Sequence, residues 1–245
     1  MTRRLVLFDV DGTLIADGGA SRAGFVRALA EAYGYRGDLA PYDFSGRTDP
    51  QIARMVLRDD GFSDAEITER LPDLWLRYLE YLEENATTER VRALPGIKAL
   101  VEALAGQPGV MLALLTGNIE PGARLKLTPP KLNHYFPFGA FGSDSADREQ
   151  LPPFAVDRAS VVDGHRFAGA DIVIIGDSVY DVRCGVPYQA TTIAVASGKT
   201  SAERLRAENP RHLFESAENL GAMMDAILGA RDQWRGMRTR PLTRS

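Results

Sequence analysis

Residues 5–14 read LVLFDVDGTL, an apolar run that ends abruptly in two carboxylates, a glycine and a threonine. Four consecutive apolar residues, Leu5 to Phe8, predict a strand that is covered on both faces, as in the parallel sheets of α/β folds. Because side chains alternate along a strand, Asp9 and Asp11 point the same way if the extended conformation continues. Two neighbouring carboxylates repel unless a cation lies between them or one keeps its proton. The stretch therefore predicts a magnesium site with an acid/base group beside it.

A surface turn is the alternative interpretation of Asp9 to Gly12, because Asp-Gly is common turn chemistry. Gly12 lets the backbone leave the sheet under either interpretation. The two interpretations differ in what they expect of the rest of the chain. Carboxylates delivered by a strand to a functional site should be matched by other strands that end in polar groups.

The composition favours a soluble cytoplasmic protein that acts on a small molecule. The chain has 245 residues, 44% of them hydrophobic, which suits one large domain with a smaller one inserted. A net charge of −4 gives no broad positive field for nucleic acid or an anionic membrane. Cys184 is the only cysteine, so no internal disulfide is expected. Asp9 and Asp11 interrupt the N-terminal apolar run too early for a signal peptide or a membrane span. We expect a monomer or a small homo-oligomer.

Helical patterns fill one early segment of the chain. Residues 16–92 show apolar side chains at helical spacing, whereas everything after Pro95 alternates strands and helices. We therefore predict an all-helical domain over residues 16–92, inserted into an α/β core of residues 1–15 and 93–230 with a doubly wound parallel sheet. The arginine-rich residues 231–245 are expected to form a disordered tail.

Capping residues indicate where the helices of the inserted segment begin. Ser21 is expected to cap the first helix, Asp49-Pro50 to start the second, and Ser63 to open the third through a capping box. Apolar and aromatic side chains recur at helical spacing over residues 71–82. We interpret that stripe as packing, not as a ligand site.

Two further apolar runs end in reactive groups, as the first one does. Residues 110–115 are followed by Thr116-Gly117-Asn118, and residues 172–175 by Gly176-Asp177-Ser178. In open parallel sheets, ligands bind beyond the carboxyl ends of the strands. Three strand ends that carry carboxylates and a hydroxyl therefore predict one shared site.

These motifs, in this order, resemble those of the haloacid-dehalogenase-like (HAD) superfamily, in particular its phosphoglycolate-phosphatase-like branch with an inserted helical cap. Asp-x-Asp-Gly-Thr, from Asp9 to Thr13, resembles the first motif, and Thr-Gly-Asn at Thr116 resembles the second. Gly-Asp-Ser-x-x-x-Asp, with Asp177 and Asp181, resembles the closing acidic motif. The resemblance covers nearly the whole chain and implies a Rossmann-like core under a helical cap.

The resemblance implies a magnesium-dependent phosphatase that hydrolyses a small phosphorylated metabolite. Asp9 would form an aspartyl phosphate, and Asp11 would act as general acid and then as general base. Mg2+ would be held by Asp9, the Asp11 backbone carbonyl and Asp177, and Thr116 would hold the phosphoryl oxygens. Asp181 would support the metal or a lysine without binding the ion itself. Ser178 is expected to do the same, and the residues expected to bind phosphate or substrate are Gly12, Thr13, Gly117, Asn118 and Arg47.

The chain lacks the Lys-Pro pair that commonly supplies the catalytic lysine of the superfamily, so that role has two candidates. Arg148 lies at roughly the expected place, but its guanidinium would need a differently shaped pocket. Lys126 is the preferred candidate, because a helix that starts near Glu120 would direct its side chain back toward Thr116. Lys131 follows two prolines and is expected to lie too far away.

Several alternatives remain open at this stage. Asp177 and Asp181 could simply cap a helix, and Lys126 could be a solvated lysine. Arg47 could bind a second anionic group of the substrate or be a plain surface arginine. The alternatives to a phosphatase are a phosphomutase of the β-phosphoglucomutase type and a non-catalytic, phosphate-binding regulatory protein.

Overall fold

Six parallel strands form the central sheet of residues 3–229, the part of the chain that this computed structural model describes. Their order across the sheet is β5-β4-β1-β6-β7-β8. The strands are β1 (Arg4–Phe8), β4 (Val110–Leu115), β5 (Gly139–Ala140), β6 (Ile172–Gly176), β7 (Thr191–Val195) and β8 (His212–Phe214). Phe8 lies beside Leu114 and Ile175, so the neighbouring strands β1, β4 and β6 end at nearly the same level. The predicted parallel sheet is confirmed.

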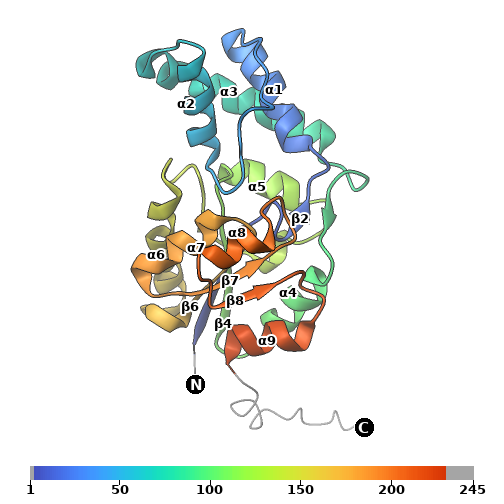
Figure 1. Cartoon of the computed structure of the whole chain (residues 1–245), viewed down its shortest axis with the longest axis vertical. Coiled ribbons are helices and arrows are strands. Elements are labelled where there is room, and N and C mark those ends of the chain that lie inside the picture. The colour runs from blue at the N-terminus through green and yellow to red at the C-terminus, as the bar shows by residue number, and fades with distance from the viewer. Residues whose placement is uncertain (1–2, 230–245) are drawn as a thin grey trace.

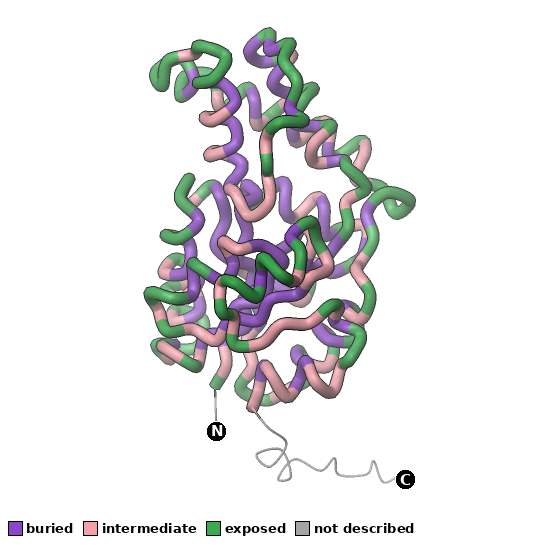
Figure 2. Tube along the Cα trace, in the orientation of Figure 1, coloured by how far each residue is buried: buried purple, intermediate pink, exposed green. Residues whose placement is uncertain are grey.

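Helices cover both faces of this sheet (Figure 1), and its strands are largely buried between them (Figure 2). Val6 and Phe8 of β1 pack in one cluster with α4 (Ile97–Ala105), α5 (Glu120–Leu127) and α9 (Leu220–Leu228). Leu5 and Leu7 face the other way and pack with α6 (Leu151–Asp163) and α7 (Val179–Gly185). The alternation along one strand thus serves two cores, which is the doubly wound arrangement. The remaining helices of this part are α8 (Ala202–Ala207) and the short 3-10 turns η1 (Asn133–Tyr135), η2 (Arg148–Gln150), η3 (Gly169–Asp171) and η4 (Val186–Tyr188).

A helical cap lies beyond the carboxyl ends of the strands (Figure 1). It consists of α1 (Ala20–Tyr33), α2 (Asp49–Asp59) and α3 (Asp64–Asn85), and it has its own hydrophobic cluster. Phe25 packs edge-to-face on Trp75 and Tyr78, so the aromatic stripe of the sequence is packing, as predicted. The chain enters and leaves the cap through a short antiparallel pair that the sequence analysis missed, β2 (Ile15–Ala16) and β3 (Arg92–Ala93). We keep residues 16–92 as the proposed extent of the cap.

The helix starts of the cap follow the capping chemistry of the sequence, with one exception. Thr48 caps α2 with Pro50 in its first turn, and Ser63 opens α3 through a capping box. The prediction for Ser21 was wrong, because the N-cap of α1 is Gly19. The Asp17 carboxylate instead accepts hydrogen bonds from the backbone N–H groups of Gly19 (2.9 Å) and Ser21 (2.8 Å). These contacts satisfy two of the free donors of the helix start, so the Ser21 hydroxyl is not needed as the N-cap.

None of the helices within residues 3–229 combines enough length and apolar character to cross a membrane. The predicted disordered tail, residues 231–245, lies outside the described residues.

Candidate active site

Three neighbouring strand ends bring their polar residues to one cavity of about 470 Å³ between the sheet and the cap. Asp9 follows β1, Thr116 follows β4, and Asp177 follows β6; all three side chains are buried. Most of the other predicted site residues also line this cavity: Asp11, Gly12, Gly117, Asn118, Arg47 and Lys126. Thr13 lies just behind, where its hydroxyl donates to Asp177 Oδ1 at 3.3 Å.

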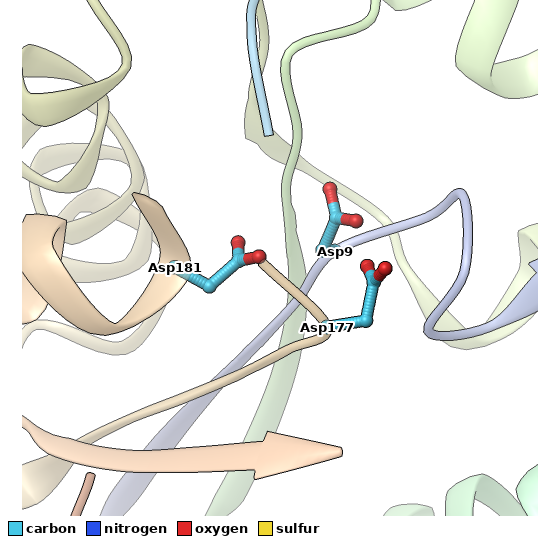
Figure 3. A group of neighbouring side chains, drawn as sticks. All are labelled: Asp9, Asp177 and Asp181. Carbon is cyan, nitrogen blue, oxygen red and sulfur yellow. The ribbon is translucent and has the colours of Figure 1, made fainter. Parts of the chain in front are cut away.

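Asp9, Asp177 and Asp181 form a buried acidic cluster (Figure 3), in which one carboxylate oxygen from each lies within 4.8 Å of the others. Burial raises the pKa of Asp9 to about 7, and the negative charges of Asp181 and Asp11 act in the same direction. Burial and the charge of Asp9 also raise the pKa of Asp177 well above its ordinary value. The nearby positive charge does not fully compensate the negative charge of such a cluster. Carboxylate oxygens are also the ligands that Mg2+ prefers. The cluster could therefore bind a metal ion.

Arg148 supplies the positive charge of this cluster from the 3-10 turn η2. Its side chain is 3% exposed, and its Nη2 donates to Asp9 Oδ1 at 3.0 Å and to Asp181 Oδ1. The other oxygen of Asp181 accepts from the Ser178 backbone N–H at 3.0 Å and from the Ser178 hydroxyl at 2.6 Å. Asp181 thus takes part in the start of α7, as the capping alternative predicted, but as the N3 residue of a capping box whose N-cap is Ser178, and it also pairs with Arg148. Both oxygens of Asp181 accept hydrogen bonds, which makes Asp9 and Asp177 the more available metal ligands of the cluster.

Lys126 lies on the other side of the site and is fully buried, which rules out the solvated-lysine alternative. Its Nζ donates to Asp11 Oδ2 at 2.5 Å and to the Ser21 hydroxyl at 2.9 Å. Burial alone would lower the pKa of Lys126, but the nearby charge of Asp11 and other acidic groups raises it above its ordinary value. Lys131 is exposed. The two candidate cations therefore contact different carboxylates, Arg148 the first aspartate of the motif and Lys126 the second.

Asn118 forms hydrogen bonds with a residue that follows β1 and with one that follows β4. Its Nδ2 donates to Asp11 Oδ2 at 2.8 Å and to Thr116 Oγ1 at 2.7 Å. The Thr116 oxygen acts as an acceptor in this contact, so its O–H group can still donate a hydrogen bond to a ligand. Asp11 Oδ1 is buried without a hydrogen-bond partner among residues 3–229. The site therefore holds a hydroxyl donor on Thr116 and a carboxyl oxygen on Asp11 that have no partner among residues 3–229, the latter closed off from solvent.

The loop before α2 brings the cap directly onto the strand ends. A Cβ atom at Gly117 would lie 2.1 Å from the backbone oxygen of Arg47, and one at Gly46 would lie 2.3 Å from Ser178 Oγ. Only glycine permits these approaches, and the positive φ of Gly46, 68°, adds to its requirement. Arg47 is half-buried and borders the cavity. Its guanidinium carbon Cζ lies 5.6 Å from the centre of the Tyr180 ring.

Asp49 is a site residue that the sequence analysis used only as a helix start. Its backbone N–H donates to the Gly117 carbonyl at 2.7 Å, and its Oδ2 accepts from the Ile119 N–H at 2.8 Å. Burial raises the pKa of Asp49 to about 6, although Lys126 lowers it. No local pattern distinguishes this aspartate from any other acid in a first helical turn, so the sequence held no signal for its position.

The loop after β7 also reaches the site and was missed. The Ser197 hydroxyl donates to the Gly12 carbonyl at 2.7 Å, and a Cβ atom at Gly198 would lie 1.7 Å from Asp177 Oδ2. Lys199 follows on the edge of the cavity. The rule that identified the first three strand ends would have identified this one, since β7 is the next parallel strand of the sheet.

The sequence matches the family model described as haloacid dehalogenase-like hydrolase over residues 6–185, and one described as HAD-hydrolase-like over residues 152–220. The first match spans well over half of the chain. The protein therefore belongs to the haloacid dehalogenase-like hydrolase family, as the order of its motifs predicted. No curated protein matches the sequence significantly.

Solved structures of similar fold cover almost the whole chain. One is a predicted phosphoglycolate phosphatase from Haemophilus somnus, with a TM-score of 0.69 and 19% identity over 91% of this chain and 99% of that one. CbbY from Rhodobacter sphaeroides in complex with phosphate has a TM-score of 0.67 and 20% identity, over 89% of this chain and 96% of that one. A candidate β-phosphoglucomutase from Thermotoga maritima has a TM-score of 0.60 and 18% identity, over 92% of this chain and 100% of that one. These likenesses confirm the predicted core with its helical cap.

Proposed function

We propose that the protein is a magnesium-dependent phosphatase that hydrolyses a small phosphorylated metabolite through an aspartyl phosphate. One observation carries the proposal: Asp9, Asp11, Thr116 and Asp177 line a single cavity under the cap. The family comprises hydrolases, and one solved structure of the same fold is a predicted phosphoglycolate phosphatase. Another of the same fold was solved in complex with phosphate.

Asp9, Asp177 and the backbone carbonyl of Asp11 would hold the Mg2+ ion. The fit rests on the donor set, because Asp9 and Asp177 are buried and have raised pKa values. Among residues 3–229, Arg148 is the only buried cation that forms an ion pair with their cluster. When bound, the ion supplies positive charge that lets an anionic phosphate approach an anionic nucleophile. Arg148 holds Asp9 in place and contributes a permanent charge of the same sign.

The reaction would divide between the two aspartates of the first motif. A carboxylate oxygen of Asp9 attacks phosphorus, the ester P–O bond breaks, and the leaving oxygen takes a proton from Asp11. Oδ1 of Asp11 would carry that proton, because Lys126 and Asn118 both donate hydrogen bonds to Oδ2. Asp11 then takes a proton from a water molecule that attacks the phosphorus of the aspartyl phosphate, which releases phosphate and restores Asp9. Thr116 would donate a hydrogen bond from its hydroxyl to a phosphoryl oxygen in both steps.

The cap would close the site to bulk water and contact the rest of the substrate. Phe25, Phe44, Ile52 and Tyr78 border the cavity from the cap, and Arg47 provides a cation at its edge. We propose that Arg47 binds a second anionic group of the substrate. The proposal includes a cytoplasmic location, no nucleic-acid or membrane partner, and a monomeric or small homo-oligomeric state.

Hydrolysis of p-nitrophenyl phosphate in the presence of Mg2+ tests the proposal. We expect turnover by the wild type and none by Asp9→Asn, since the amide is nearly isosteric but is no nucleophile. Substantial activity in that variant would refute the covalent mechanism. If the wild type is active, a screen of phosphorylated metabolites would identify the substrate.

A phosphomutase of the β-phosphoglucomutase type is the nearest alternative, because it would use the same aspartyl phosphate and return the phosphoryl group to a sugar. The fold of the candidate β-phosphoglucomutase from T. maritima is compatible with it. Release of inorganic phosphate, as against isomerisation of a sugar phosphate, distinguishes the two. A non-catalytic phosphate-binding protein would not need Asp11 in the cavity beside Asp9.

A further inference from the structure

Lys126 connects the second aspartate of the motif to the cap. Its ammonium group is fully buried and has two hydrogen-bond acceptors in the structure, Asp11 Oδ2 at 2.5 Å and Ser21 Oγ at 2.9 Å. Asp11 belongs to the core, whereas Ser21 lies in the first turn of α1, the first helix of the cap. A single buried ammonium group thus joins the two parts of the molecule next to the proposed acid/base group.

The position of Ser21 depends on how the chain enters the cap. Gly18 and Gly19 have φ values of 59° and 83°, and the Asp17 carboxylate accepts hydrogen bonds from the N–H groups of Gly19 and Ser21. A positive φ is readily adopted by glycine alone, so this turn is specified by its sequence. The turn fixes the Ser21 hydroxyl relative to the core.

Two carboxylates besides Asp11 lie close enough to interact with the Lys126 ammonium group. Asp17 and Asp49 both interact with its charge, and both border the same cavity as Asp11. A lysine stem has four rotatable carbons and its ammonium is a point charge, so electrostatic attraction alone does not select one carboxylate among three. A second, directional hydrogen bond does select one, because it fixes where the nitrogen lies.

We propose that Ser21 is a positioning residue: its hydroxyl holds the Lys126 ammonium against Asp11, so that the cap entry turn orients the acid/base carboxyl group toward the leaving oxygen. This inference rests on the proposed phosphatase function. Lys126 and Asn118 both donate to Oδ2, which leaves Oδ1 as the Asp11 oxygen without a hydrogen-bond partner among residues 3–229. Loss of the Ser21 hydroxyl would let Lys126 move toward Asp17 or Asp49 and would leave Asn118 to hold Asp11 Oδ2 without the ammonium group.

The test compares two phosphate esters that differ in their need for a proton. The p-nitrophenolate ion leaves readily without protonation, whereas the alkoxide of glycerol 2-phosphate requires it. The quantity to measure is kcat/KM, which covers the steps up to phosphoryl transfer and excludes the later hydrolysis of the aspartyl phosphate. For Ser21→Ala we expect a loss of at least about tenfold with glycerol 2-phosphate and of less than about threefold with p-nitrophenyl phosphate.

Two further variants separate positioning from a general loss of cap structure. Ser21→Thr keeps the hydroxyl and should restore most of the activity toward glycerol 2-phosphate. Ser63→Ala removes the cap of α3, an exposed serine away from the cavity, and should affect both esters equally and slightly. Equal losses with both esters in Ser21→Ala, or no loss with either, would overturn the role of Ser21. A wild type that hydrolyses neither ester would instead overturn the phosphatase function on which it rests.

Discussion

Replacement of Lys126 by alanine should lower turnover of an alkyl phosphate at least about a hundredfold, equal to about 2.7 kcal/mol of transition-state stabilisation. The magnitude follows from what the side chain contacts. A hydrogen bond to a charged group contributes about 1.5–3 kcal/mol, and Lys126 makes one with Asp11 at 2.5 Å. The Lys126 side chain is 0% exposed, so the upper part of this range applies to its ammonium group, although solvent screens the partly exposed Asp11 to some extent.

The assay is kcat with glycerol 2-phosphate, measured for a set of matched variants. Lys126→Met keeps the buried volume and should lose about as much activity as Lys126→Ala, because the charge and not the packing is responsible. Lys131→Ala removes an exposed lysine five positions along the chain and should be nearly silent. Denaturation curves of all variants would confirm that folded enzyme is being compared.

Arg148→Ala completes the set, because Arg148 contacts Asp9 and Asp181 instead of Asp11. Its removal leaves buried carboxylates without their counter-charge, which costs about 3–5 kcal/mol of folding stability. We therefore expect Arg148→Ala to be less stable as well as less active. Near-normal turnover by Lys126→Ala together with collapsed turnover by a folded Arg148→Ala would refute the assignment of a catalytic role to Lys126.

Three more outcomes are expected. Asp11→Asn should transfer phosphate from p-nitrophenyl phosphate to Asp9 and then retain it, and intact-protein mass spectrometry that finds no phosphorylated species would contradict the division of roles. Excess chelator should abolish turnover and added Mg2+ should restore it, so full activity without divalent ions would refute the metal site. Asp49→Asn should change the pH dependence of stability: burial raises the pKa of Asp49 from 3.8 to about 6, so its protonation stabilises the fold below pH 4 and this contribution is lost as the pH rises through 6. The wild type should thus lose about 3 kcal/mol relative to Asp49→Asn between these limits, and parallel unfolding curves across that range would disprove it.

The strand ends of the candidate site could be predicted because the signal is local. An apolar run followed by Asp9, Thr116 or Asp177 identifies both a buried strand and the polar group that follows it. Parallel strands then place their carboxyl ends at one edge of the sheet, without any knowledge of which strands are neighbours. The order β4-β1-β6 adds what the sequence did not contain, namely that these three strands are adjacent.

The contacts between cap and core could not be predicted from such patterns. Ser21 of the cap and Lys126 of the core are 105 positions apart, and the same holds for long-range contacts within the core, such as Arg148 and Asp9, which are 139 apart. Periodicity states which face of a helix is buried, but it does not state which element covers that face. Ser21 was predicted to be the N-cap of a helix, because a serine before a helix usually has that function. The side chain of the neighbouring Asp17 accepts the hydrogen bonds of that helix start instead.

The absence of a Lys-Pro pair is explained by the division of positive charge between two residues. Arg148 Nη2 lies among three acceptors, Asp9 Oδ1, the Leu115 carbonyl and Asp181 Oδ1, and a guanidinium group stays charged at every pH at which the protein is folded. Lys126 contacts only Asp11 of the two motif aspartates in residues 3–229. Because Arg148 follows β5 and Lys126 lies on α5, each carboxylate of the first motif has its own cation on its own element. A substitution at one cation should therefore perturb attack on phosphorus or proton transfer separately, which one lysine shared by both aspartates would not allow.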